Sequence, residues 1–274
     1  MPPVYYNTLP TLADKYDLFI TGSDQVFNCL ITWFDYRFFL SFCEDNNKNA
    51  SYAASFGFEL ENLTDKEKDF IHKNLNHLKY LSVREQQGEK IVQTLIPQKE
   101  VGVHIDPSFL LTKADWKKIA KSPAINQPYC IIFLIMHRDK EFIKYAKQVA
   151  TEKGWKVLFV SARFNLVNVL TGIHIAPTVE EWLGLFLNAE FIFTNSFHGL
   201  AFDINFNKPF MVGPSNPKWP AASRLNNLLD ITGLKHRKFD PSSDICEKED
   251  WDSVNKKLEK ERQKAFDYLK KITK

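Results

Sequence analysis

The residues best suited to chemistry follow an apolar stretch in the second half of the chain. Thr194, Asn195 and Ser196 end this stretch, and His198 and Gly199 open what should be a helix. In a parallel α/β sheet such a junction lies at the carboxyl edge, where the first-turn N–H groups and the dipole of the helix attract anions. A hydroxyl and an imidazole there suit a phosphate or a carboxylate. A capping Ser196 with a structural His198 fits the residues about equally well.

A second polar group follows an apolar run near the N-terminus. Gly22, Ser23 and Asp24 come directly after residues 17–21. A turn glycine with a hydroxyl and a carboxylate could bind a polyol through hydrogen bonds, with Asp24 as the base for a sugar hydroxyl. The same residue types are common in ordinary turns, so alone the pattern favours a structural role.

Two arginines lie at the ends of predicted strands. Arg84 and Arg138 occupy these positions, and Arg224 and Arg237 flank a helical segment. A guanidinium can hold a carboxylate or a phosphate through two parallel hydrogen bonds. A single arginine is more often part of an ion pair, so only several that converge would make an anion site.

Strands that alternate with helices must position all of these residues. Helices are predicted over 64–78, 85–95, 140–153 and 178–188, and strands over 17–21, 50–57, 80–84, 101–107, 129–137, 155–161 and 190–194. This alternation implies parallel strands and an α/β architecture in both halves. We place the domain boundary within 113–127, which gives domains 1–122 and 123–274, with a terminal surface helix in the second.

Composition and charge limit the class of protein. The chain has 274 residues, 44% of them hydrophobic, so it can bury the cores of two globular domains. A net charge of +3 gives no argument for nucleic acid, and four scattered cysteines fit a reducing compartment better than a disulfide or zinc framework. Without a signal peptide or an apolar run near the roughly 20 residues of a membrane span, we expect a cytoplasmic protein with no transmembrane segment. Common nucleotide, serine-hydrolase and zinc-protease motifs are missing, and no metal is expected.

Several segments, taken in order, resemble the polysaccharide pyruvyl transferase family. They cover about Asp17 to Arg237 and are residues 16–28, 51–57, 82–85, 106–111 with Trp116, 194–199, 208–210 and 223–229. The resemblance implies two Rossmann-like domains facing each other across a cleft, as in GT-B glycosyltransferases. Family members usually carry an earlier strand and helix, so the N-terminal domain is expected to lack its first βα unit.

The same resemblance implies a reaction and its partners. A pyruvyl group would pass from phosphoenolpyruvate to a sugar hydroxyl and leave a pyruvate ketal on a cell-surface polysaccharide. Phosphoenolpyruvate is then the donor substrate, no further cofactor is expected, and the acceptor is a sugar or lipid-linked saccharide on the side of the N-terminal domain. The oligomeric state stays open.

The two anionic groups of phosphoenolpyruvate require a cluster of donors. We expect His198, Arg84 and Arg138 to supply it, together with the binding residues Asn195, Ser196, Gly199 and Ser23. A protonated His198 would be the general acid, and Asp24 or another carboxylate the base. One arginine is missing relative to members with Arg-Leu-His, because Ser196 stands in its place.

Two alternative functions remain at this stage. A GT-B-type glycosyltransferase using a nucleotide sugar would need a ribose-binding carboxylate, for which Asp203 and Glu180 are candidates. A non-catalytic glycan-binding relative could use the aromatic run from Trp33 to Phe42 as its surface. Such a run more often belongs to the core.

Overall fold

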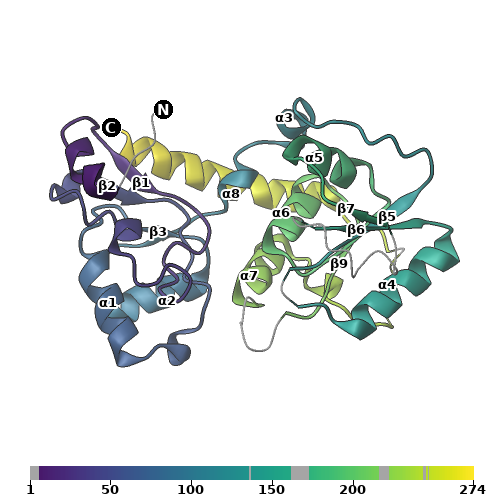
Figure 1. Cartoon of the computed structure of the whole chain (residues 1–274), viewed down its shortest axis with the longest axis horizontal. Helices are drawn as coiled ribbons and strands as arrows, with labels where there is room; N and C mark the ends of the chain where they lie inside the picture. The colour runs from purple at the N-terminus through teal and green to yellow at the C-terminus, as the bar shows by residue number, and fades with distance from the viewer. Residues whose placement is uncertain (1–5, 136, 162–172, 216–221, 243–244, 246) are drawn as a thin grey trace. The chain divides into compact units, whose positions relative to one another are not determined.

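The computed structural model describes residues 6–135, 137–161, 173–215, 222–242, 245 and 247–274. The chain forms two compact units (Figure 1), the first made of residues 1–110 and 259–274 and the second of residues 111–258. Both are α/β units with parallel strands, which confirms the fold class predicted from the sequence. No helix among the described residues is long and apolar enough to cross a bilayer.

The four strands formed by the described residues of the first unit run in the same direction. They are β1 (Phe19–Thr21), β2 (Asn49–Ser51), β3 (Ser82–Val83) and β4 (Gly102–Val103). β1 pairs with β2 and β3 with β4, and bridges from Ala50 to Tyr80 and from Ala54 to Val83 join the two pairs. Polar residues that follow these strands therefore meet at one carboxyl edge.

Two helices cover the core of the first unit. α1 (Asp65–Leu75) begins at Thr64 in a capping box, as the sequence predicted, and α2 (Gln86–Leu95) follows β3. The core beneath them includes the fully buried rings of Phe27, Phe39 and Phe56.

The second unit is built on one parallel sheet with the strand order β7-β6-β5-β8-β9. These strands are β5 (Tyr129–Phe133), β6 (Lys156–Val160), β7 (Ile173–Ile175), β8 (Phe191–Thr194) and β9 (Phe210–Val212). The helices are α3 (Lys113–Lys117), α4 (Lys140–Lys153), α5 (Val179–Asn188), α6 (Phe197–Asn205) and α7 (Ala222–Thr232).

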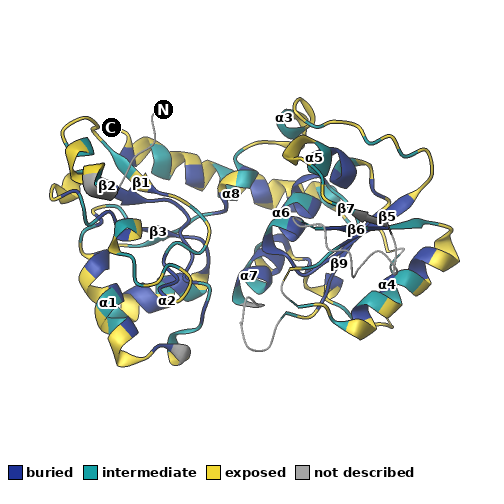
Figure 2. Ribbon diagram, viewed as in Figure 1, coloured by how far each residue is buried: buried dark blue, intermediate teal, exposed yellow. Residues whose placement is uncertain are grey.

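Helices lie on both faces of this sheet. Phe142 of α4 meets Phe193 of β8 on one face, with ring centroids 5.8 Å apart, and Phe186 of α5 meets Phe133 of β5 on the other at 5.7 Å. Figure 2 shows the central strands as the buried part of the unit. A sheet covered on both faces requires nearly continuous apolar strands, which explains the sequence of β5 and β8.

The units divide the chain differently from the predicted domains 1–122 and 123–274. Residues 111–122 belong to the second unit, where Trp116 of α3 meets Phe202 edge-on at 5.1 Å and the Lys121 amide donates to the Glu180 carbonyl at 2.8 Å. The terminal helix α8 (Trp251–Ile272) has its last turns in the first unit. There the hydroxyl of Tyr268 donates to the carbonyl of Ser51 at 2.7 Å. Such contacts join residues far apart in the chain and leave no local sequence signal.

Candidate functional site

Two hydroxyl groups fix the junction between β8 and α6. Thr194 Oγ1 donates to the carbonyl of Phe133 at 2.8 Å and accepts from the amide of Ser196 at 3.0 Å. Ser196 is the N-cap of α6, and its Oγ accepts from the amide of Gly199 at 3.2 Å. Ser196 is only 2% exposed, so capping is the role that the structure gives it.

Gly199 allows α6 to approach the sheet closely. A Cβ at this position would lie 2.5 Å from Thr194 Oγ1 and 3.0 Å from the ring of Phe133. The glycine is buried, and this lack of space for a side chain explains why a glycine stands here. Substrate binding by Gly199 stays a prediction.

His198 lies in the first turn of α6 and is half-buried. The ring of Phe197 meets the imidazole edge-on, with ring centroids 5.4 Å apart. The positive end of the helix dipole lies in this same turn. The imidazole is therefore not sealed in the hydrocarbon core, and it retains the exposure that an anion-binding role requires.

Asn195 ties three loops together at the carboxyl edge. Its Nδ2 donates to the carbonyls of His137 at 2.8 Å and Pro214 at 3.3 Å, while its Oδ1 accepts from the amide of Ile135 at 2.8 Å. These bonds use both amide protons of the side chain. The structure therefore indicates that Asn195 positions the loops after β5 and β9, whereas the sequence suggested contact with substrate.

The loop held by Asn195 carries Arg138, which is exposed. Its neighbour His137 is half-buried, and Nε2 of this ring lies 3.8 Å from a carboxylate oxygen of Asp139. Sequence reasoning did not single out His137, although it follows the same strand as Arg138. β5 ends at Phe133, earlier than the predicted residue 137, and the remaining residues form this loop.

A polar network occupies the carboxyl edge of the first unit. Arg84 Nη1 donates to Asp106 Oδ2 at 2.8 Å and to Ser23 Oγ at 3.3 Å, and Ser23 Oγ donates to the same oxygen of Asp106 at 2.7 Å. Arg84 Nη2 lies 3.7 Å from Asp24 Oδ1, and Arg84 Nε lies 3.8 Å from Glu85 Oε2. Ser23, Asp24 and Arg84, which the sequence singled out separately, thus belong to one cluster.

This network changes the role expected for Arg84. Its side chain is 1% exposed, and three carboxylates surround one guanidinium. A buried arginine that faces these carboxylates offers no open face to phosphoenolpyruvate, so the predicted clamp of Arg84, Arg138 and His198 needs correction at Arg84. Asp106 and Glu85 were not among the candidates from the sequence. Asp106 lies inside the predicted strand 101–107, so the rule that found Asp24 applies directly only to Glu85, which follows the predicted strand 80–84.

Asp24 is the accessible member of the network. Its side chain is 63% exposed, and its backbone has a φ of 83°, a left-handed conformation that is uncommon for residues other than glycine. The amide of Ser55 donates to the carbonyl of Asp24 at 2.8 Å and holds the turn in place. Strained residues of this kind concentrate at functional sites.

The two edges differ in the chemistry that they suit. On the first unit, buried acidic groups surround Arg84 and leave an exposed carboxylate, which suits hydroxyl groups better than anions. On the second unit, a helix N-terminus, His198 and an exposed Arg138 suit an anion.

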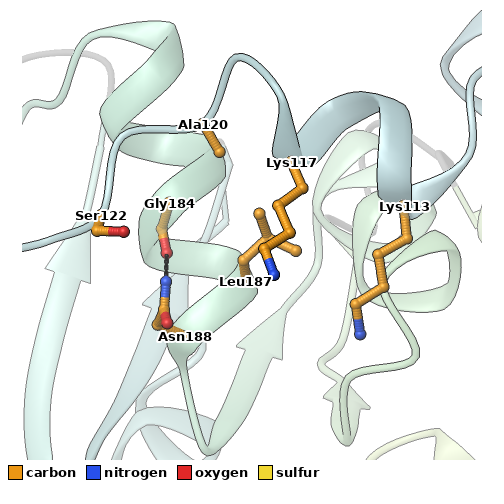
Figure 3. A pocket seen from close by; sticks show the side chains of 7 residues that line it. All are labelled: Lys113, Lys117, Ala120, Ser122, Gly184, Leu187 and Asn188. Atoms are coloured by element: carbon orange, nitrogen blue, oxygen red, sulfur yellow. Dashed lines mark hydrogen bonds between the residues drawn. The ribbon is translucent and has the colours of Figure 1, made fainter.

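A cavity of about 210 Å³ lies elsewhere on the second unit, lined by residues of α3, of the segment that follows it and of the second half of α5. Figure 3 shows Lys113 and Lys117 of α3 beside it, with Asn188 bonded back to the carbonyl of Gly184. Lys113 Nζ donates to the carbonyl of Phe206 at 2.6 Å, and burial, with Lys117 adding to it, lowers the pKa of Lys113. This lysine thus satisfies a carbonyl at the end of α6, away from His198.

Comparisons with known proteins agree with this fold. A UDP-GlcNAc 2-epimerase from Methanocaldococcus jannaschii is similar over 92% of this chain and 72% of its own, with 16% identity and a TM-score of 0.53. A crystal structure of the Methanocaldococcus jannaschii enzyme in complex with UDP-GlcNAc and UDP is similar over 93% of this chain and 72% of its own. Its identity to this chain is 15%, and its TM-score is 0.51. These likenesses are consistent with the predicted GT-B-like fold and show the fold alone. The search of curated proteins found no match.

The family assignment comes from a different comparison. The family model described as polysaccharide pyruvyl transferase matches residues 2–212, which include every candidate residue at both carboxyl edges. This match spans most of the chain and agrees with the ordered segments found in the sequence. The chain belongs to the polysaccharide pyruvyl transferase family.

Proposed function

We propose that this chain transfers a pyruvyl group from phosphoenolpyruvate to a sugar and forms a pyruvate ketal during the synthesis of a cell-surface polysaccharide. The family supports pyruvyl transfer in general. The observation that carries the choice of donor is His198, half-buried in the first turn of α6 at the carboxyl edge of a parallel sheet. A multiply charged anion suits that position.

The atoms of this reaction balance without a further reactant. C3 of phosphoenolpyruvate gains one proton, the bond between C2 and the phosphate oxygen breaks, and two sugar hydroxyl oxygens form bonds to C2. The two hydroxyl groups lose two protons, one of which balances the proton on C3 while the other leaves on the phosphate. His198 is the proposed acid toward C3 or the departing phosphate, because an imidazole changes its protonation state near neutral pH.

The remaining roles follow from exposure and charge. Arg138 is exposed on the loop held by Asn195 and is the proposed guanidinium for the donor. Asp24 is the proposed base for a sugar hydroxyl, because it is the exposed carboxylate of its network. Arg84 is assigned to hold Asp24 and Asp106 and not to bind the donor.

The first test is the binding of phosphoenolpyruvate, measured as a rise in the unfolding temperature of the full chain. A ligand at a hundred times its dissociation constant stabilises the folded state by about 2.7 kcal/mol. We expect the parent to show this gain and His198→Gln to lose it. The control is His72→Gln, which replaces an exposed histidine on α1 and should show the same gain as the parent. No gain at millimolar phosphoenolpyruvate would contradict the proposal, and a gain with UDP instead would favour a nucleotide-sugar transferase.

The second test separates binding from turnover. Asp24→Asn keeps the size of an exposed side chain and suits a positive φ, so the variant should fold and bind phosphoenolpyruvate like the parent. Phosphate release in the presence of acceptor saccharides should be lost, because no base remains at this position. A variant that releases phosphate at the parental rate would remove Asp24 from the mechanism. Glycan binding without any phosphate release by the parent would favour a non-catalytic relative.

A further inference from the structure

Residues 29–40, here called the aromatic turn, follow the strand-end turn of Asp24 and have an inward and an outward face. On the inward face the ring of Phe39 stacks on Phe27 at 4.8 Å, and the ring of Phe34 meets Phe70 of α1 edge-on at 5.2 Å. Phe39 and Cys29 are fully buried. These contacts anchor the aromatic turn in the core of the first unit.

The outward face of the aromatic turn is apolar. Five large side chains expose between a third and nearly all of their surface, and they are Leu30 (51%), Ile31 (47%), Trp33 (88%), Tyr36 (42%) and Phe38 (38%). Scattered single apolar residues are normal on protein surfaces, but a concentration of this kind indicates an interaction site. The aromatic run noted in the sequence is therefore part core and part surface.

The backbone holds Trp33 outward at an energetic cost. Trp33 and Phe34 both have a φ of 57°, and consecutive left-handed conformations are rare for bulky residues. The amide of Phe34 donates to the carbonyl of Cys29 at 2.9 Å, and the buried side chains on either side fix the geometry. Strain that surrounding contacts maintain around an exposed indole is typical of a functional surface.

Several backbone and side-chain polar groups of the aromatic turn are satisfied within the turn or by the adjoining Asn28. Asn28 Oδ1 accepts from the amides of Leu30 and Ile31 at 3.2 and 3.3 Å, and the Asn28 carbonyl accepts from the amide of Thr32 at 2.9 Å. The carboxylate of Asp35 accepts from the backbone amide of Arg37 at 2.9 Å and from its Nε at 2.7 Å. Groups that are satisfied within their own segment need no hydrogen bonds from a partner, and lipid chains can supply none.

The charge and the side-chain types of this surface also favour contact with a lipid bilayer. Lys66 Nζ lies 5.1 Å from the centroid of the Phe34 ring and is exposed on α1, where a cation complements anionic lipid headgroups. Trp and Tyr favour the interface between lipid and water because each combines an apolar ring with a polar group.

We propose that the aromatic turn is a membrane-contact site whose outward face enters the interfacial layer of a phospholipid bilayer that contains anionic lipids. The contact does not span the membrane and does not depend on the proposed reaction. Asn28, which anchors the aromatic turn, follows Asp24 within the same strand-end segment. A lipid-linked saccharide is the kind of acceptor that this contact would serve, and that consequence alone rests on the proposed function.

The test is flotation of the full chain with vesicles in the absence of phosphoenolpyruvate. We expect binding to vesicles of equal parts phosphatidylcholine and phosphatidylglycerol, and weaker binding to phosphatidylcholine alone. Trp33→Asn should weaken binding about tenfold or more, as should Leu30→Ser combined with Ile31→Ser, because each removes exposed apolar surface. Asn tolerates a positive φ, so Trp33→Asn should unfold at the parental temperature or above.

The control removes comparable apolar surface from the second unit. Ile119→Ser combined with Val179→Ser changes side chains that are 52% and 69% exposed, and it should leave vesicle binding unchanged. Absence of binding to both kinds of vesicle, parental binding by Trp33→Asn, or equal weakening by the control would each overturn the proposal. A dimer that Trp33→Asn dissociates, without vesicle binding by the parent, would assign the surface to a second copy of the chain and likewise overturn it.

Discussion

At the scale of single residues, the same side-chain types serve different purposes at the two carboxyl edges. Arg84 is enclosed by carboxylates, whereas Arg138 is exposed on a loop. Asp24 is exposed, whereas Asp203 is fully buried within α6 and cannot be the ribose-binding carboxylate considered from the sequence. Exposure and the nearest charges decide the role of each group.

Arg84 allows a prediction at this scale. Replacing it in Arg84→Met would leave Asp106 and Glu85 buried without the cation that both contact, and breaking a buried ion pair in this way costs about 3–5 kcal/mol. Arg84→Lys keeps the charge and should lose less. Denaturant unfolding measures both, and Ser23→Ala, which removes one hydrogen bond to Asp106, should cost only about 1 kcal/mol. A loss below about 1 kcal/mol in Arg84→Met would contradict a structural role.

At the scale of elements, α6 is defined by what happens at its N-terminus. Thr194 and Ser196 fix the turn, and Gly199 lets the first turn of the helix lie against β5 and β8. These neighbours therefore fix the turn of the helix on which His198 stands. A small change in helix position would move the imidazole.

Gly199→Ala tests this dependence. The new Cβ would lie 2.5 Å from Thr194 Oγ1, so we expect a loss of about 1–3 kcal/mol in unfolding free energy from overpacking, more than the helix propensity of alanine returns. Gly22→Ala is the matched control, because a Cβ there meets nothing within 4 Å. Calorimetry of both variants checks the expectation, and equal stabilities would show that the junction has room to adjust.

At the scale of the whole molecule, each unit carries a titratable group whose pKa is shifted by burial, and the two groups have opposite effects on stability. Burial lowers the pKa of His104 in the first unit to about 4, with Lys264 acting in the same direction and Glu261 opposing. Burial raises the pKa of Asp203 in the second unit well above its usual value, with Lys208 opposing. Acid should therefore weaken the first unit and strengthen the second.

His104 sets the expectation for the acid side. The unfolded histidine binds a proton below about pH 6.5, whereas the folded one, beside Ser82 at 2.8 Å and against the ring of Tyr268 at 4.4 Å, stays neutral to about pH 4. Its contribution to stability is thus lost as pH falls through this window. A change of one pKa unit corresponds to about 1.4 kcal/mol of unfolding free energy. Because solvent screens a partly exposed group, we expect a maximum loss of about 1–2 kcal/mol. Melting curves at pH 7 and pH 4.5 should differ less in His104→Gln than in the parent.

Asp203 sets the expectation for the alkaline side. Both of its carboxyl oxygens lack a hydrogen-bond partner among the described residues, and the side chain is fully buried. The folded state keeps its proton above about pH 4, where the unfolded state has lost it, so stability is greatest in acid and falls as pH rises. Asp203→Asn stays neutral at every pH and should reduce the difference in melting temperature between pH 5 and pH 8. An unchanged difference would mean that Asp203 is ionised in the folded protein.

The sequence by itself determined the features that depend on neighbours along the chain. The capping boxes at Thr64 and Thr178, the stop at Gly154 and the position of His198 after a buried strand are all local patterns. Parallel pairing followed from the alternation of strands and helices. The α/β class, the first turns of the helices and the candidate residues that directly follow predicted strands at each carboxyl edge could therefore be predicted.

Only the tertiary structure decided which polar groups neutralise one another and which side chains remain exposed. Arg84 meets Asp106, Tyr268 returns to Ser51, and Trp33 faces outward beside a buried Phe39. These outcomes depend on contacts between residues distant in sequence, or on backbone angles that residue types do not encode. Burial and charge pairing are properties of the folded neighbourhood, so no pattern along the chain could specify them.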